Sequence, residues 1–214
     1  MDVLGLIPAR GGSKGIPRKN LAQVGGKPLL AWTVEAALRA SELTRVVVST
    51  DDDEIAAEAG VEVLRRPADL AADDTPMLEV VRHAAAELSP DVVVLLQPTS
   101  PLRRAEHVDA AVRLLLESGA DAVVSVVAVP HRYSPEALMD VVDGRVVARG
   151  SARTRQEKAL VYARNGPAVL AVRSERLGDD LYGGDCRPYL MDARDSLDLD
   201  DSFDLELADL LLRR

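Results

Sequence analysis

The sequence of 214 residues has a single cysteine, no excess of positive charge and no long apolar run. Because Cys186 has no second cysteine to pair with, an internal disulfide is excluded, as is typical of proteins from a reducing compartment. The N-terminus lacks a cationic segment followed by an apolar core, and no apolar run approaches the ~18 residues of a membrane span. These absences predict a cytoplasmic protein with no membrane contact.

The charge balance argues against binding to a nucleic acid polymer. The formal net charge is −9, whereas proteins that bind nucleic acids carry a basic surface that attracts phosphate at long range. Any phosphate binding must therefore be local. Hydrophobic residues make up 47% of the chain, which is enough for the core of one domain of ordinary size.

Apolar segments rich in Val, Ile and Leu alternate with amphipathic segments. The strands predicted from them are residues 3–9, 45–50, 61–66, 91–98 and 121–129. The predicted helices, in which apolar residues recur three and four positions apart, are residues 29–41, 52–60, 77–88 and 105–119. Continuous apolar strands are typical of a sheet covered on both faces, and their alternation with helices predicts a doubly wound, mostly parallel α/β fold.

The regular alternation weakens after residue 130. Residues 141–150, VVDGRVVARG, predict a short hairpin, and residues 151–167 look irregular. A final strand is predicted near 195–200, before a helix that begins at about residue 202. The capping candidates of this helix are Asp200, Asp201 and Ser202. We expect one domain over residues 1–214, with an arm or lid at about 130–167.

The loop after the first predicted strand is unusually cationic for an acidic chain. Residues 7–21 read IPARGGSKGIPRKNL, with cations Arg10, Lys14, Arg18 and Lys19 and glycines Gly11, Gly12 and Gly15. The loop follows the carboxyl end of a strand, where α/β folds bind ligands. Its spacing fits neither the P-loop nor the GxGxxG fingerprint, and Pro17 prevents an immediate helix. The sequence favours a polyphosphate site here, and a flexible, solvated basic loop is the alternative.

Five later segments strengthen the functional interpretation. After the loop come VVVSTDDDEIAAEAG, RPADLAADDTP, LLQPTSPLR, RQEKALVYARNGP and DSLDLDDSFDLELAD. In this order the six segments resemble the CMP-N-acylneuraminate synthetases, the enzymes that activate sialic acids. The resemblance implies transfer of the nucleotidyl group of CTP to the anomeric hydroxyl of a nine-carbon α-keto sugar acid, with Mg²⁺ and release of pyrophosphate. It also implies a homodimer in which an arm of one subunit closes the acceptor site of the other.

The resemblance assigns Arg10 and Lys19 to the triphosphate as the catalytic cations. Attack at the α-phosphorus builds negative charge that fixed cations and backbone N–H groups stabilise. Arg66 and the loop through Thr75 are placed near the base, and the alternative is that Arg66 only ends a strand and pairs with Asp69. The expected nucleotide-binding residues are Arg10, Gly11, Gly12, Ser13, Lys14, Lys19, Asn20, Arg66 and Thr75.

The acceptor is expected at the end of the fourth predicted strand. There the resemblance assigns Gln97, Thr99 and Ser100 to the keto sugar, in a turn that two prolines stiffen. Without the resemblance, a plain capped turn would be favoured. Arg155, a cation suited to an acceptor carboxylate, and Asn165 complete the expected set. The residues after Asn165 lack the aromatic expected in a sialate enzyme, which leaves the sugar open.

The segment DSLDLD at 195–200 alternates leucine with aspartate. In a strand this alternation puts Asp198 and Asp200 on one face, where two converging carboxylates require a positive partner such as Mg²⁺. The resemblance assigns the metal to this pair. A solvated acidic cap before the last helix is the alternative.

These observations predict a Mg²⁺-dependent cytidylyltransferase that acts on an acid of the sialic, legionaminic or pseudaminic type. One alternative keeps the chemistry but uses GTP, or a phosphosugar or phosphonate acceptor. Another is a nucleotide-binding protein without turnover. The joint presence of Arg10, Lys19, Asp198 and Asp200 speaks against the last, because a binding module has little need for both phosphate cations and a metal pair.

Overall fold

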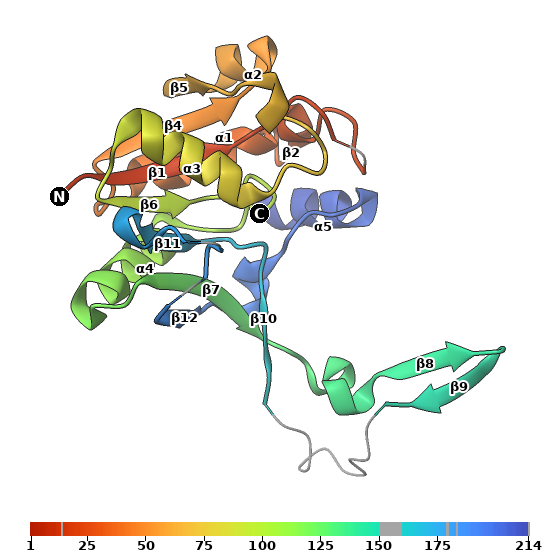
Figure 1. The fold of residues 1–214 in the computed structure, drawn as a ribbon. Coiled ribbons are helices and arrows are strands. Elements are labelled where there is room, and N and C mark those ends of the chain that lie inside the picture. The colour runs from red at the N-terminus through yellow and green to blue at the C-terminus, as the bar shows by residue number, and fades with distance from the viewer. Residues whose placement is uncertain (14, 150–159, 179, 183, 214) are drawn as a thin grey trace.

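The computed structural model describes residues 1–13, 15–149, 160–178, 180–182 and 184–213, and its largest element is an eight-stranded sheet (Figure 1). The strands lie in the order β10-β7-β11-β6-β1-β4-β5, and β12 also pairs with β7. Their bounds are β1 Val3–Pro8, β4 Arg45–Thr50, β5 Glu62–Arg65, β6 Val92–Leu95, β7 Ala122–Ala128, β10 Tyr162–Arg164, β11 Leu170–Arg173 and β12 Cys186–Leu190.

Most of the sheet is parallel. Strand β1 runs parallel to β4 and β6, β4 to β5, and β7 to β12. Strand β11 lies antiparallel between β6 and β7, and β10 continues this antiparallel pairing along β7. The predicted doubly wound, mostly parallel α/β fold is confirmed. The chain turns to opposite sides of β1 when it forms β4 and β6, so the switch point of the sheet lies between β1 and β6.

Helices cover both faces of the sheet. Buried residues of α1 and α4 pack with one face in a cluster that includes Leu30, Val34 and Leu115. Val81 and Ala84 of α3 pack with the other face, and Figure 1 shows α3 and α1 on opposite sides of β1. The bounds are α1 Leu29–Arg39, α2 Asp53–Glu58, α3 Met77–Leu88, α4 Ala105–Ser118 and α5 Ser202–Leu212. All five predicted helices are present. Helix α3 has the predicted bounds, and α1, α2 and α4 are one to three residues shorter than predicted.

The C-terminal segment corrects one prediction. Residues Ala193–Ser196 form a 3₁₀ helix, and residues 197–200 are not a strand. This extended segment is attached by a backbone bond from the Leu199 N–H to the Thr99 carbonyl, at 2.9 Å. The last helix begins at Ser202 as predicted, because the Asp201 carboxylate accepts from the N–H groups of Phe203 and Asp204.

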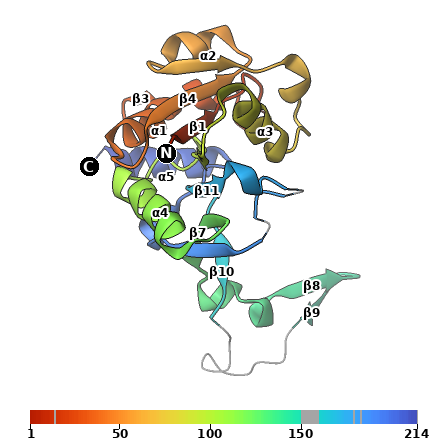
Figure 2. The same ribbon diagram turned by 60° about the vertical axis from the view of Figure 1, so that its left-hand side comes forward.

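Two hairpins stand outside the sheet. The first joins β2 (Gln23–Val24) to β3 (Lys27–Pro28), near α1. The second joins β8 (Met139–Val142) to β9 (Arg145–Ala148) and confirms the hairpin predicted at 141–150. It projects well away from the sheet in both views (Figures 1 and 2). Among the described residues, no helix has both the length and the apolar character needed to cross a bilayer.

Candidate active site

A cavity of about 360 Å³ lies beyond the carboxyl ends of β1 and β6, at the switch point of the sheet. Pro8 at the end of β1 and Met77 at the start of α3 form part of its wall. It also brings together most of the residues predicted from sequence, which come from four separate segments. These are Arg10, Gly12, Ser13, Lys19, Asn20, Arg66, Gln97, Thr99, Asp198 and Asp200.

Ser100 and Asn165 lie behind this wall, buried in the protein. Ser100 is 0% exposed and Asn165 is 3% exposed. The Asn165 carboxamide accepts from the Ser125 hydroxyl at 2.6 Å and donates to the Ser196 hydroxyl at 3.0 Å. Both side chains therefore position the strand ends around the cavity. Gly11 and Thr75 do not line the cavity: the Gly11 N–H donates to Asp51, and the Thr75 hydroxyl donates to the Asp69 carbonyl at 3.4 Å. Lys14 and Arg155 fall outside the described residues.

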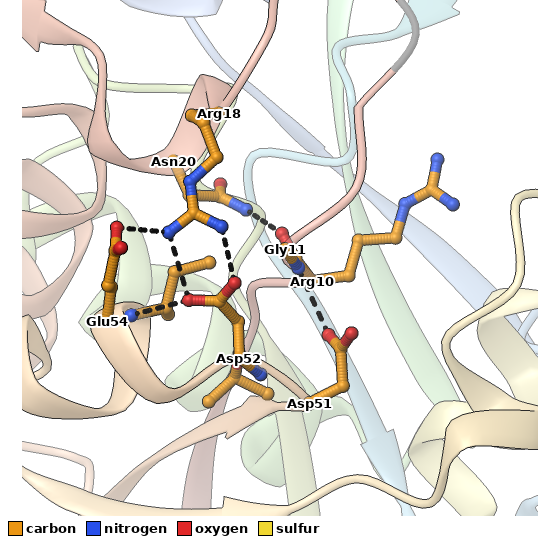
Figure 3. A network of polar contacts seen from close by, with 9 residues as sticks. Arg10, Gly11, Arg18, Asn20, Asp51, Asp52 and Glu54 are labelled. Carbon is orange, nitrogen blue, oxygen red and sulfur yellow. Dashed lines mark hydrogen bonds and ion pairs between the residues drawn. The ribbon is translucent and has the colours of Figure 1, made fainter.

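The cationic loop is anchored by the segment that follows β4 (Figure 3). The Arg18 guanidinium contacts both Asp52 and Glu54. Asp52 also caps α2 by accepting from the Ile55 N–H at 3.0 Å. The hydrogen bond from Arg18 is the main reason that the pKa of Asp52 lies below its usual value. The idea that Arg18 offers its charge to a polyphosphate is therefore corrected, because Arg18 fastens the loop to the protein.

Two loop glycines are needed for contacts within the protein. A Cβ on Gly11 would collide with the Asp52 carboxylate, and one on Gly15 would lie 2.8 Å from the Asp200 carbonyl oxygen. The Gly11 N–H donates to Asp51, and the Asn20 side chain donates to the Arg10 carbonyl (Figure 3). A Cβ on Gly12 would meet nothing within 4 Å. Gly12 is therefore the loop glycine whose backbone is open to a ligand.

Three fixed cations line the cavity. Arg10 forms an ion pair with Asp73, and Figure 3 shows its guanidinium directed away from the Arg18 cluster. The Lys19 ammonium donates to the Leu199 carbonyl at 2.7 Å, which ties the loop to the C-terminal segment. Arg66 donates to the Ser49 carbonyl at 2.8 Å rather than pairing with Asp69. Burial lowers the pKa of Arg66 to about 10, so it stays charged at neutral pH.

Asp198 and Asp200 face the cavity from an extended segment. The intervening Leu199 is 0% exposed and packs with Val24 and Leu29, so the leucine fixes the direction of both neighbours. Burial raises the pKa of Asp198, and the Asp200 carboxylate adds to the effect, while the nearby Thr99 hydroxyl and Lys19 oppose it.

The Asp198 carboxylate has one oxygen that lacks a partner. Within the described residues, the buried Oδ1 atom accepts no hydrogen bond, and the Thr99 hydroxyl is close to Asp198 but outside hydrogen-bond geometry. A buried, unpaired carboxylate oxygen beside a second carboxylate suits a divalent cation. Among the described residues, no group of three or more Asp, Glu, His or Cys side chains is arranged so that it could hold a metal ion by itself. A metal held here would complete its shell with substrate phosphate oxygens and water.

A second cavity of about 490 Å³ adjoins the first and shares Gln97, Gly166 and Asp198 with it. Its remaining walls are Arg164, Pro167 and Tyr182. Gly166 has a φ of +113°, and a Cβ there would lie 2.9 Å from the Ser100 hydroxyl and 3.1 Å from Asp198 Oδ1. Only glycine combines this backbone conformation with this close approach to Asp198.

Sequence reasoning missed several residues that shape the two cavities. Asp51 and Asp52 follow a predicted strand at its carboxyl end, and that position was the available signal for their contact with the loop. Arg164 and Tyr182 carried no comparable signal, because their strand and loop could not be recognised from apolar periodicity.

Comparisons with known proteins agree with this geometry. Residues 4–208 match the family described as cytidylyltransferase. The N-acylneuraminate cytidylyltransferase of Escherichia coli O18:K1:H7 is 33% identical over 96% of this chain and 51% of its own length. The CMP-N,N'-diacetyllegionaminic acid synthase of Legionella pneumophila is 32% identical over 99% of this chain and 97% of its own length. The chain thus spans about half of the first relative and nearly all of the second.

The fold is also found among solved structures. A CMP:2-keto-3-deoxy-manno-octonic acid synthetase, solved in complex with CTP, superposes with a TM-score of 0.76. The alignment covers 99% of this chain and 98% of the other, at 18% sequence identity. At this identity the likeness concerns the fold.

Proposed function

Because the chain belongs to the cytidylyltransferase family, we propose that it transfers CMP from CTP to the anomeric hydroxyl of a nonulosonic, sialic-acid-like α-keto acid and releases pyrophosphate. The observation that carries the proposal is one cavity that joins phosphate-binding cations to a carboxylate pair. The cations suit a polyphosphate, and the carboxylates suit the metal that accompanies it. A module that only bound a nucleotide would not require both.

The nucleotide occupies the side of the cavity formed by the cationic loop. Arg10 and Lys19 contact the triphosphate and stabilise the charge that develops as the α-phosphorus is attacked. Arg10 exchanges its ion pair with Asp73 for phosphate. The open backbone at Gly12, with Ser13, completes the phosphate cradle. Lys14 remains a predicted phosphate contact. Arg66 and Met77, across the cavity, are placed to contact the nucleoside.

The acceptor enters from the second cavity. Gln97 lines both cavities and contacts the sugar, and Thr99 lies on the wall between Gln97 and the carboxylate pair. Because Ser100 and Asn165 are buried, their part in the proposal is to position this wall. Arg155 in the arm remains a predicted acceptor contact.

Asp198 and Asp200 would hold Mg²⁺. When bound, Mg²⁺ neutralises phosphate oxygens and lowers the pKa of the acceptor hydroxyl. The buried Leu199 fixes the positions of both carboxylates. The hydrogen bond from Lys19 to the Leu199 carbonyl holds the cationic loop next to them.

The experiment that tests the function is pyrophosphate release with four nucleoside triphosphates, with and without Mg²⁺, against a panel of acids. The panel contains sialic, legionaminic and pseudaminic acids, a deaminated nonulosonic acid and an octulosonic acid. We expect release with CTP and at least one nonulosonic acid, and none without metal or acceptor. Release with GTP alone, or silence across the panel while CTP still binds, would overturn the proposal.

We further propose that the protein is a homodimer and that the β8–β9 hairpin forms part of its interface. The hairpin exposes a row of apolar side chains, with Val141 76% exposed and Val146 66% exposed. An isolated two-stranded hairpin with such a surface gains stability when a partner covers it.

Replacing Val141 by aspartate is expected to weaken the dimer at least tenfold, because the interface would then bury an unpaired charge. Sedimentation velocity across a concentration series measures the dissociation constant. Leu38 of α1, which is 59% exposed, offers a matched control as Leu38→Asp, expected to leave the dimer intact. A wild-type protein that sediments as a monomer at all concentrations would refute the dimer.

A further inference from the structure

The cavity next to the nucleotide site contains an arginine in a defined orientation. The guanidinium carbon of Arg164 lies 4.8 Å from the centre of the Tyr182 ring, and both side chains line the cavity of about 490 Å³. Gln97 and Asp198 link this cavity to the nucleotide cavity. A group bound at Arg164 is therefore in the space that adjoins the phosphate and metal residues.

The sheet explains why Arg164 points into this space. Arg164 ends β10 and lies opposite Val126 of β7 in an antiparallel pair. Because side chains alternate along a strand, Arg164 shares the Val126 face, whereas the next residue, Asn165, is buried against Ser125. Tyr182 packs on the hydrophobic cluster that contains Val126. The Tyr182 ring thus contacts the hydrophobic cluster and also the Arg164 guanidinium, so the packing of the ring limits where the guanidinium can lie.

Arg164 forms no ion pair with a carboxylate in the part of the chain that the structure describes. The two arginines of the cationic loop are paired, Arg10 with Asp73 and Arg18 with Asp52. None of the ion pairs among the described residues includes Arg164, which is solvent-accessible at the cavity wall. A guanidinium stacked on a ring keeps its in-plane N–H groups available, and that edge matches the two oxygens of a carboxylate.

We propose that Arg164, oriented by Tyr182, binds the carboxylate of the acceptor acid. This inference rests on the proposed function. In the cyclic form of an α-keto sugar acid, the carboxylate and the anomeric hydroxyl are attached to the same carbon. Fixing the carboxylate at Arg164 therefore restricts where the hydroxyl can lie, on the side of the cavity that Gln97 and Asp198 share with the nucleotide. Sugars without this carboxylate would lose both binding and orientation.

The test compares acceptor kinetics of Arg164→Gln with those of the wild type, using an accepted acid and its C1 amide. Loss of a charge-assisted bidentate contact should raise the KM of the acid about 10- to 100-fold. The KM of CTP should stay within about twofold, because the nucleotide cavity is unchanged. The wild type should prefer the acid to the amide, and Arg164→Gln should lose that preference.

Four further variants separate this role from structural effects. Arg187→Gln, an exposed arginine of β12 that pairs with Asp185, should keep wild-type kinetics. Tyr182→Phe should keep them too, whereas Tyr182→Leu should raise the KM of the acid, by less than Arg164→Gln does. Arg155→Gln should retain the preference for acid over amide. Thermal melts confirm that each variant is folded.

The outcomes distinguish this inference from the proposed function. If the wild type turns over an acid and Arg164→Gln behaves like Arg187→Gln, the inference is wrong and the function stands. It is also wrong if the acid–amide preference disappears in Arg155→Gln instead. Calorimetric titration of the acids in the presence of Mg²⁺ and a CTP analogue with a methylene between the α and β phosphorus tests binding without turnover. A wild type that binds none of the acids overturns the inference and the function together.

Discussion

Replacing Asp198 by asparagine is expected to lower turnover about a hundredfold or more, while the metal-free protein becomes more stable at neutral pH. The loss of turnover follows from removing a metal-binding carboxylate whose cation stabilises charge on phosphate. The gain in stability has a separate cause. Burial raises the pKa of Asp198 above its usual 3.8, so the ionised side chain opposes folding at neutral pH. Asparagine has nearly the same shape and no charge.

The pH dependence of this gain has a definite sign. A carboxyl whose pKa is higher in the folded protein than in the unfolded chain destabilises the fold once the pH rises above the unfolded value. The advantage of Asp198→Asn should therefore be present at pH 7 and vanish below pH 3.8, the ordinary value for aspartate. Thermal unfolding without metal at several pH values measures it.

A matched control for Asp198→Asn is Asp192→Asn, an exposed acid earlier in the same C-terminal stretch. This variant should change neither the unfolding temperature nor turnover. Pyrophosphate release across a Mg²⁺ titration gives the catalytic comparison. A near-normal rate for Asp198→Asn at every Mg²⁺ concentration would remove the metal role assigned to this carboxylate.

Replacing Lys19 by alanine is expected to cost about 2–4 kcal/mol of transition-state stabilisation, or roughly 30- to 1,000-fold in kcat/KM. The Lys19 ammonium is held at 2.7 Å from the Leu199 carbonyl and lines the cavity beside the carboxylate pair. It is therefore fixed before the reaction begins, and its charge acts on oxygens that become more negative as the α-phosphorus is attacked.

Lys27→Ala provides the opposite signature. Lys27 pairs with Glu35 and lies 3.6 Å from the centre of the Trp32 ring, on the β2–β3 hairpin away from the cavity. Its removal should lower the unfolding temperature and preserve turnover. Lys19→Ala should instead lower turnover and leave the unfolding temperature nearly unchanged. If the Lys19→Ala defect appeared only as a lower unfolding temperature, Lys19 would be a structural residue.

The fold was predictable where the sequence pattern reflects burial on both faces. Strands β1, β4, β6 and β7 read as continuous apolar runs, because helices cover the sheet on both sides. Strands β10, β11 and β12 of the sheet were not predicted. Strands β10 and β12 are mostly exposed, whereas β11 is buried but only four residues long, and all three pair with β7, far away in the chain. Such long-range pairing leaves no local periodicity to detect.

The alternation of Leu and Asp at 195–200 predicted correctly which side chains face the cavity, although the predicted strand is absent. Leu199 is buried and its two aspartate neighbours face the cavity, as strand alternation predicts. A strand also requires a partner along its length. Among the described residues, the one backbone bond of this segment to the turn after β6 runs from the Leu199 N–H to the Thr99 carbonyl. Alternation with a period of two therefore predicts which side chains are buried, but it does not predict that the segment is hydrogen-bonded to a neighbouring strand.

The location of the candidate site was predictable from the sequence. Which of several similar residues face the cavity, and which contact other parts of the protein, was not. Arg10 and Arg18 occupy one loop, and the sequence gives both as phosphate cations. Only the folded chain shows Arg18 paired with Asp52, which reaches the loop from the end of the neighbouring strand β4. The burial of Ser100 and Asn165 likewise depends on where Ser125 and Ser196 lie in space.

The central claim is that CMP passes intact from CTP to a sugar acid, and phosphorus NMR of the reaction mixture tests it most directly. With wild-type protein, Mg²⁺, CTP and an accepted acid, the account predicts that pyrophosphate and a single new phosphodiester appear in equal amounts as CTP is consumed. Pyrophosphate accompanied by free CMP and unchanged acid would show hydrolysis instead of transfer. That result would contradict the account.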